Sequence, residues 1–331
     1  MGVNLSFQGS LDPEVDRATF FDRVREFSRE MEWGCQPLDL PSRYATLGAR
    51  EFVDAKIQGL VLLPHFACEP LPVLMVEDAG ILVDSFVRDE REQGVTLDPE
   101  PMVSTLFAGA AVHQEICAFL HELRTRFVTN LVVDDEAGFF DEGDAGKLAE
   151  CFRQAWAALG RELSQAAASG SNDLEVAGFE YVRDEIGAGG DEFGRISAED
   201  QQLLRDLEAL LSARYGGLGL TLEPSAGGVE DLDLLMTEAD QQEWGADPGD
   251  PETEAFAHGL GALLGRAIVN ILGGTWVRDP QEGLVLRNVG GAGLRLNPFQ
   301  IAANRLVRGP VYGFTQHLEL LENLTRHLPG S

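Results

Sequence analysis

Hydrophobic residues recur every three or four positions along much of this chain, which is the spacing of helices that bury one face. The clearest stripe lies within residues 104–126 and consists of Val112, Ile116, Phe119, Leu120 and Leu123. The same spacing predicts further helices at about 13–31, 144–168, 197–215, 252–272, 298–308 and 312–327. Ser197 and Asp200, three residues apart, predict a capping box at the start of the helix at 197–215. We therefore expect helices to make up much of the fold.

Shorter apolar runs between glycines, prolines and acidic residues predict strands. Near the C-terminus, three such runs are separated by turns and predict an antiparallel meander at 275–277, 284–287 and 294–296. Residues 59–87 carry apolar runs that fit either strands or a buried helix. Residues 35–48, which contain Pro37 and Pro41, are expected to be irregular.

A strand is also predicted at 127–133, followed by the acidic turn 134–138 and a return strand that begins at Phe139. Asp144 is then expected to cap the next helix. The acids of this stretch lack the D-x-[DN]-x-[DN]-G order of a calcium-binding loop. We interpret them as a solvated turn and a helix cap.

These elements predict an α+β protein with two helix-rich halves, the second containing a short antiparallel β-meander packed against helices. The Ser-Gly-Ser-Asn-Asp segment at 169–173 is the best candidate for a linker. Domains are therefore expected at 11–168 and 174–331. Residues 1–10 resemble the remnant of a viral-protease cleavage tag, apart from two positions, and are expected to lie outside the fold.

The composition changes this picture mainly through charge. The chain has 55 Asp and Glu residues against 25 Lys and Arg residues, a formal net charge of −30. Such a field disfavours nucleic acid and acidic membranes as partners and favours a basic protein. The same charge is typical of a soluble or salt-adapted protein, and composition alone favours that explanation. Nothing in the sequence sets the oligomeric state.

The four cysteines lie far apart and form no C-x-x-C pair: Cys35, Cys68, Cys117 and Cys151. This spacing fits neither a zinc ribbon nor a redox motif. The sequence shows no secretory signal and predicts no transmembrane helix. A reducing cytoplasm is therefore the expected location.

His113, Cys117 and His121 are spaced four residues apart on one predicted helical stripe. Imidazole and thiolate groups at this spacing are able to share a metal ion. Three ligands over two turns extend about 12 Å along the helix axis, which is too far for one ion. A metal would need one adjacent pair and ligands from elsewhere, so the sequence predicts no metal and no cofactor.

Ala257, Gly261 and Gly265 form a stripe of small residues along the predicted helix at 252–272. Glycine lowers helix propensity, so the close approach of another backbone is the expected reason for the stripe. Phosphate-loop, serine-hydrolase and zinc-protease motifs are absent from the chain. The sequence therefore gives little support to an enzyme and indicates no catalytic residue.

A glycine-rich helix running into Gly-Gly-Thr-Trp at 256–276, a helix start at Pro298 and Phe299, and the segment 304–306 resemble a bacterial domain family of unknown function. The resemblance covers about the last third of the chain and implies an α+β fold without a known activity. Comparable small α+β domains occur among toxin-immunity proteins, which is an analogy of fold and not of site.

The leading hypothesis is a non-enzymatic protein that binds a basic partner, like an acidic antitoxin or immunity factor, because opposite charge speeds association. The alternative is an enzyme of unrecognised class with its site between the two halves. If the C-terminal half binds a partner, the candidate residues are Trp276, Arg278, Arg287 and Arg305. Arginine and exposed aromatic side chains favour such contacts, whereas a core tryptophan and arginines paired with neighbouring acids would be purely structural.

Overall fold

The fold of the chain is α+β, as the sequence predicts, and it is known from a computed structural model. The structure describes residues 3–41, 44–47, 50–54, 56–76, 80–83, 87–89, 94–97, 103–168, 173–176, 179–183, 196–215, 220, 222–241 and 251–327. The chain divides into two compact units, Met1–Ala158 and Leu159–Ser331, and the boundary between them falls within a helix. The predicted linker at 169–173 lies outside the described residues, except for Asp173, which begins a strand.

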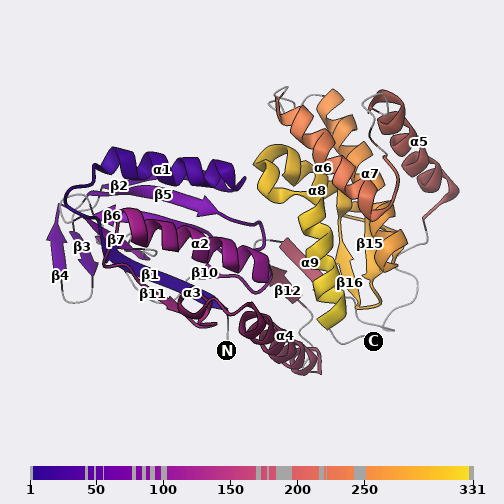
Figure 1. Cartoon of the computed structure of the whole chain (residues 1–331). Coiled ribbons are helices and arrows are strands. Elements are labelled where there is room, and N and C mark those ends of the chain that lie inside the picture. The colour runs from indigo at the N-terminus through magenta and orange to yellow at the C-terminus, as the bar shows by residue number, and fades with distance from the viewer. Residues whose placement is uncertain are drawn as a thin grey trace. The chain divides into compact units, whose positions relative to one another are not determined.

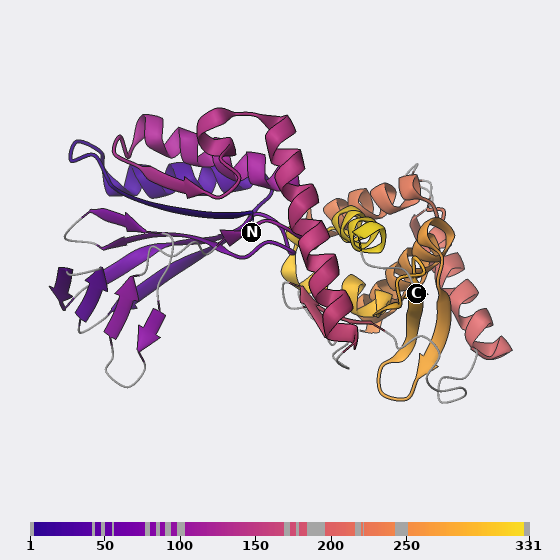
Figure 2. The same cartoon turned by 90° about the horizontal axis from the view of Figure 1, so that it is seen from below.

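Unit 1 combines a large antiparallel sheet with helices on one of its faces (Figures 1 and 2). Its helices are α1 (Arg17–Glu30), α2 (Ala110–Arg126), α3 (Phe139–Glu142) and α4 (Ala145–Ala168), which continues into unit 2. Its strands are β1 (Asn4–Ser10), β2 (Gly34–Pro41), β3 (Tyr44–Leu47), β4 (Arg50–Val53), β5 (Lys56–Leu63), β6 (Leu71–Val76), β7 (Ile81–Val83), β8 (Val87–Asp89), β9 (Gly94–Leu97), β10 (Val103–Ser104) and β11 (Val132–Asp135).

The main sheet of unit 1 has the order β10-β1-β7-β6-β5-β2. β10 and β7 pair with the two ends of β1 on one side, and β11 pairs with β1 on the opposite side. A second, four-stranded sheet has the order β4-β3-β9-β8. The apolar faces of α1 and α2 pack on the main sheet, with Phe20 and Phe119 among their fully buried side chains. Burial of these and the other apolar side chains between the helices and the sheet stabilises the unit.

Residues 3–10 belong to this fold, so the expectation that this segment lies outside it is wrong. β1 pairs with β7 and β10 on one side and with β11 on the other. Val3, Leu5 and Phe7 alternate along the segment and are almost completely buried. Alternation of apolar and polar residues is the pattern of a half-buried strand, and it identifies this segment as strand rather than tag.

Strands also replace the irregular segment predicted at 35–48. β2 pairs with β5 along its whole length, and Pro37 stands opposite Leu60. Proline removes one ladder donor, which a strand at the edge of a sheet tolerates, and β2 is the last strand in the sheet order. Among the described residues of the ambiguous run at 59–87, the end of β5 and all of β6 and β7 are strands of the same sheet, and Val87 begins β8 of the four-stranded sheet.

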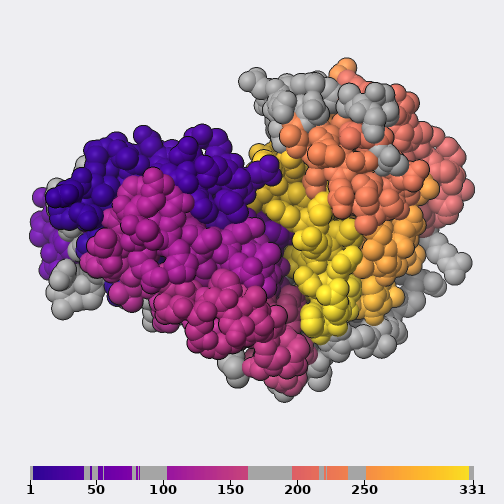
Figure 3. All heavy atoms as spheres, viewed as in Figure 1, coloured from indigo at the N-terminus to yellow at the C-terminus, as the bar shows by residue number. Residues whose placement is uncertain are grey.

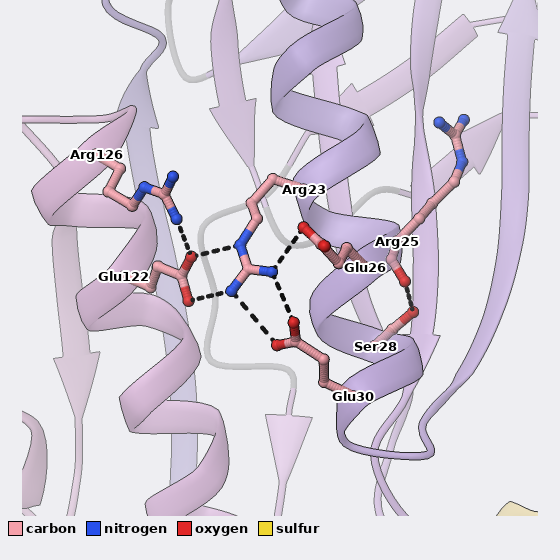
Figure 4. A network of polar contacts seen from close by, with 7 residues as sticks. All are labelled: Arg23, Arg25, Glu26, Ser28, Glu30, Glu122 and Arg126. Atoms are coloured by element: carbon pink, nitrogen blue, oxygen red, sulfur yellow. Dashed lines mark hydrogen bonds and ion pairs between the residues drawn. The ribbon is translucent and has the colours of Figure 1, made fainter.

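A charged network on the outer side of unit 1 joins α1 to α2 (Figure 4). Arg23 of α1 donates through Nε and Nη2 to both carboxylate oxygens of Glu122 of α2, at 2.7 and 3.2 Å. Arg23 also binds Glu26 and Glu30 on its own helix, and Arg126 binds Glu122 from the next turn of α2. The paired fork fixes the two helices against each other.

Unit 2 is built around α7, a long apolar helix. Its helices are α5 (Ala198–Tyr215), α6 (Ala226–Gln241), α7 (Pro251–Leu272), α8 (Pro298–Arg308), the short 3-10 helix η2 (Pro310–Tyr312) and α9 (Phe314–His327). Its strands are β12 (Asp173–Val176), β13 (Phe179–Arg183), β14 (Thr275–Asp279), β15 (Gly283–Val289) and β16 (Leu294–Leu296), in the order β12-β13-β16-β15-β14. The antiparallel meander β14–β16 confirms the prediction. The sequence did not predict α6.

The small residues of α7 allow close packing, as the stripe predicts. A Cβ atom on Gly261 would lie 2.8 Å from the Cα atom of Phe299, and one on Gly265 would lie 2.3 Å from the ring of Trp276. α7 is long and apolar enough to cross a membrane by length and composition alone. Core helices meet the same criteria, and most of α7 is buried inside unit 2.

Candidate functional site

A group of three buried polar side chains lies in unit 1, where α2 and α3 pack beside the end of β11 (Figure 1). His113 and Cys117 lie one turn apart on α2, and Asp135 is the last residue of β11. One potential ligand atom of each residue lies within 4.8 Å of those of the other two. His113 is fully buried and the side chain of Asp135 is 3% exposed. We call these three residues the α2–β11 cluster.

Thr105 determines which nitrogen of His113 carries the proton. The Thr105 hydroxyl donates to the carbonyl oxygen of Val3 at 2.8 Å, so its oxygen accepts a hydrogen bond from Nδ1 of His113 at 2.9 Å. The neutral ring therefore presents Nε2 as an acceptor. Nε2 lies 3.3 Å from Oδ1 of Asp135 and has no hydrogen-bond partner among the described residues.

Asp135 is held by the backbone of the turn that follows it. Its Oδ1 accepts from the N–H of Ala137 and its Oδ2 from the N–H of Phe140, both at 2.8 Å. Burial raises the pKa of Asp135, but His113 and the two amides outweigh burial and lower it. Burial, with the Asp135 charge, raises the pKa of the Cys117 thiol to about 12. The carboxylate of Asp135 and the unpaired Nε2 of His113 thus face each other beside a neutral thiol.

The same hydrogen bonds correct two predictions about the acidic segment. Phe139–Glu142 forms the helix α3 instead of a return strand, because Asp135 holds the amide of Phe140 and turns the chain back on itself. Asp135 is buried, so the interpretation of the acidic segment as a solvated turn is wrong at this residue. The predicted cap is confirmed, since Asp144 accepts from the N–H groups of Gly146 and Lys147.

His121 is not part of the α2–β11 cluster. Its ring stacks on Phe140 with centroids 4.1 Å apart, and its Nδ1 lies 3.1 Å from a guanidinium nitrogen of Arg124. The structure therefore brings together His113 and Cys117, as the spacing allowed, and supplies Asp135 as the third group. Sequence reasoning missed Asp135 because a turn of the backbone decides its position. The local sequence shows only that two acids, Asp134 and Asp135, follow an apolar pair, and it does not indicate which of them is buried.

A hollow of about 270 Å³ lies in unit 2, between α5, α7, α8 and the β14–β15 hairpin. Leucine and phenylalanine side chains form much of its wall, and a few charged groups complete it. The lining residues are Leu203, Leu207, His258, Arg278, Glu282, Gly283, Leu284 and Phe299. A mostly apolar hollow with a small number of polar groups is typical of a binding surface.

The four predicted binding residues of unit 2 occupy different places. Trp276 is half-buried, with its ring centroid 5.8 Å from that of Phe299, and Arg278 follows on the same face of β14 and lines the hollow. Arg287 stands opposite Thr275 in the strand register and therefore lies on the other face. Arg305 is 1% exposed, in the interior of the unit. The structure brings only the first two near the hollow.

Arg278 is engaged in an ion pair with Asp200 at the start of α5. Asp200 also forms the predicted capping box, in which its carboxylate accepts from the N–H of Ser197 and the Ser197 hydroxyl accepts from the N–H of Asp200. The bond from Arg278 lowers the pKa of Asp200 to about 2. The ion pair of Arg278 and Asp200 thus fixes one edge of the hollow, and the two opposite charges cancel there.

α5 lies at the edge of unit 2 (Figures 1 and 3), and two of its leucines line the hollow. Leu203 and Leu210 are 46% and 54% exposed, and Leu207 lies between them on the same helical face. Leu203 and Leu207 also line the hollow. We call these three residues the α5 stripe. The sequence shows the leucines but not which of the leucines of α5 remain exposed.

The acids of unit 2 are distributed unevenly along the chain. Most of them lie in residues 159–250, which include α5, whereas residues 251–331 contain slightly more Arg than Asp and Glu together. Glu199 and Asp206 are exposed on α5 near the exposed Arg205, and Glu282 of the hollow is paired with Arg295. The α5 stripe therefore lies among charges of both signs, within a stretch of the chain that is rich in acids.

Comparisons with protein families, with curated proteins and with solved structures find no match to this chain.

Proposed function

We propose that this protein acts by binding a basic protein, like an acidic antitoxin or immunity factor, and that unit 2 provides the docking surface. The observation that carries the proposal is the α5 stripe, which leads directly into the apolar hollow. Both features lie on one side of α5 and join without a break, since Leu203 and Leu207 belong to each.

The apolar part of this surface would supply most of the binding energy. Protein interfaces are dominated by a few apolar anchors that enter pockets, with a polar rim that excludes water. Leucines that are about half exposed in the free protein become fully buried when a partner covers them, at about 25 cal/mol per Å² of apolar area. The hollow would receive an apolar side chain of the partner beside Leu284 and Phe299.

The charge around the stripe would select a basic partner. Exposed carboxylates on α5, such as Glu199 and Asp206, attract Lys and Arg, and the net charge of −30 speeds the encounter over longer distances. Such steering weakens as salt rises because the Debye length is only about 8 Å at physiological ionic strength. The association rate is therefore expected to fall steeply with added salt, and the dissociation rate much less.

The test compares two kinds of leucine in the full-length protein. A partner captured at low salt is purified and its affinity is measured for the wild type and for the double variant Leu203→Asp/Leu210→Asp. We expect the double variant to bind about 30-fold more weakly or worse, because it places charges in the apolar contact. Leu234→Asp on α6 is the matched control, since Leu234 is 56% exposed and does not line the hollow.

Equal binding by both variants would contradict the placement of the docking surface on α5. Failure to capture any partner at low or high salt would contradict the binding function itself. In that case a metabolite that raises the melting temperature of the protein would favour the enzyme that the sequence leaves as the alternative.

A further inference from the structure

We propose that His113, Cys117 and Asp135 bind a single divalent transition-metal ion such as zinc inside unit 1. The α2–β11 cluster plays no part in the proposed docking surface of unit 2. Its three side chains offer an imidazole nitrogen, a thiolate sulfur and a carboxylate oxygen, which are the ligand types that zinc uses in proteins.

The first argument is the unpaired nitrogen. Thr105 holds the proton of His113 on Nδ1, so the lone pair of Nε2 faces the carboxylate of Asp135 at 3.3 Å in a fully buried position. Two acceptors at this distance repel each other unless a cation lies between them. A second proton on the ring would supply such a charge, but Nε2 and Oδ1 do not have hydrogen-bond geometry. A metal ion coordinated by both atoms satisfies both lone pairs.

The second argument is distance. Ligand atoms of a tetrahedral zinc site lie roughly 3.3–3.8 Å apart, given bonds of about 2.0–2.3 Å. The separation of 3.3 Å between Nε2 and Oδ1 already matches this geometry. Every pair in the cluster lies within 4.8 Å, so the Cys117 sulfur needs to approach the other two atoms by no more than about 1.5 Å. A side-chain rotation provides a movement of this size.

The third argument is charge. A thiolate and a carboxylate together carry two negative charges, and a divalent cation cancels them in this buried site. Binding releases the Cys117 proton to solvent, which couples metal affinity to pH. Soft sulfur and imidazole ligands favour zinc or cobalt over magnesium and calcium. A water molecule would complete the tetrahedron, as in zinc sites with three protein ligands.

The surroundings already orient two of the three ligands. Thr105 fixes the ring of His113 through Nδ1, and the backbone amides of the following turn hold both oxygens of Asp135. Metal sites typically have such hydrogen bonds from surrounding groups to the ligands, and these bonds raise the affinity for the metal. The edges of Phe139 and Phe152 face His113 with ring centroids at 6.4 and 6.0 Å, and they enclose the site in apolar side chains.

The experiment is a cobalt titration of the full-length protein after treatment with a chelator. We expect one Co²⁺ per chain, a thiolate-to-cobalt charge-transfer band and the visible absorption of tetrahedral cobalt. Zinc should displace cobalt and abolish both signals. Cys117→Ala should lose the charge-transfer band and bind at least 100-fold more weakly, while circular dichroism reports whether its fold is intact.

Two controls separate this site from other histidines and thiols. His121→Ala and Cys68→Ala should bind cobalt as the wild type does, because neither residue belongs to the cluster. Thr105→Val keeps all three ligands but loses the hydrogen bond to Nδ1, so its metal affinity should fall 10- to 100-fold. Because this variant retains the thiolate, its charge-transfer band at saturation should match that of the wild type.

The proposal fails if the wild type shows no thiolate-to-cobalt band at saturating metal. It also fails if Cys117→Ala keeps the band, or if His121→Ala loses it. Asp135→Asn gives an independent check, since its amide oxygen is still able to accept a hydrogen bond from the turn while the ligand charge is gone. Cobalt affinity equal to that of the wild type in this folded variant would exclude Asp135 as a ligand.

Discussion

The central helices of the two units, α2 in unit 1 and α7 in unit 2, are both buried but in different ways. α2 buries His113 and Cys117 among apolar side chains, and Asp135 and Thr105 surround them with polar partners. The buried face of α7 consists of apolar and small residues, and its glycines lie against aromatic rings. The packing of α2 therefore includes buried hydrogen bonds and charge beside its apolar contacts, whereas that of α7 depends on shape.

The largest effect is expected on the polar side of this comparison. Asp135→Ala leaves the buried amides of Ala137 and Phe140 without an acceptor, so the free energy of unfolding should fall by about 3 kcal/mol. Urea unfolding in the presence of a chelator measures this without any contribution from metal. Asp134→Ala is the control, because the neighbouring side chain is exposed, and it should change stability by less than about 0.5 kcal/mol. Equal losses would show that Asp135 is not a structural acceptor.

The second prediction tests shape in α7. Gly265→Ala places a Cβ atom 2.3 Å from the Trp276 ring and 2.9 Å from Pro298, so the helix has to move away from β14. Overpacking of this kind should lower the free energy of unfolding by about 2 kcal/mol, even though alanine favours the helix. Gly259→Ala provides the contrast on the same helix, because its nearest neighbour is a Leu211 side-chain atom at 3.3 Å. Thermal unfolding should show a clear loss for the first variant and almost none for the second.

The difference between the two helices also explains what could be predicted from sequence. The glycine stripe, the meander and the capping box at Ser197 and Asp200 are local patterns, and the structure confirms them. The spacing of His113 and Cys117 is local as well, and it correctly places both on one face of a helix. These features could be predicted because residues within about two turns determine them.

The remaining errors concern contacts between distant parts of the chain. The resemblance of residues 1–10 to a tag is misleading because the strand partners of β1 lie far along the sequence, in β7, β10 and β11. Pro37 suggested an irregular segment, although a proline is tolerated in an edge strand. The third member of the α2–β11 cluster depends on the turn after β11, and no periodic pattern marks it. Local chemistry therefore predicts single elements better than it predicts a site shared between two of them.

A third prediction concerns the outer face of α2. Hydrogen bonds from Arg23, despite some burial, lower the pKa of Glu122, so the ion pair stabilises the folded protein above the ordinary pKa of glutamate. Glu122→Gln should cost about 1 kcal/mol at pH 7, and this difference should shrink as pH falls through the lowered pKa. Urea unfolding at several pH values measures the change. A difference that stays constant down to acidic pH would mean that the charge of Glu122 does not matter.

The smallest effect is expected at the corresponding charge pair of α7, which joins Arg266 to Glu208 of α5. Here burial raises the pKa of Glu208, and Arg266 offsets this only in part. Because the folded protein then binds the proton more tightly than the unfolded chain, stability contributed by Glu208 increases as pH falls through the raised pKa. Glu208→Gln should therefore change stability at pH 7 by less than about 0.5 kcal/mol and should lose this gain on acidification.

The two glutamates thus make opposite predictions for the same type of substitution. The quantity to compare is the free energy of unfolding of the wild type minus that of the variant, measured across the same pH range. On acidification it should decrease for Glu122 and increase for Glu208. If both differences shrank, the ion pair with Arg266 would outweigh the burial of Glu208. The outer faces of α2 and α7 would then be stabilised in the same way, and the contrast between the helices would be confined to their buried sides.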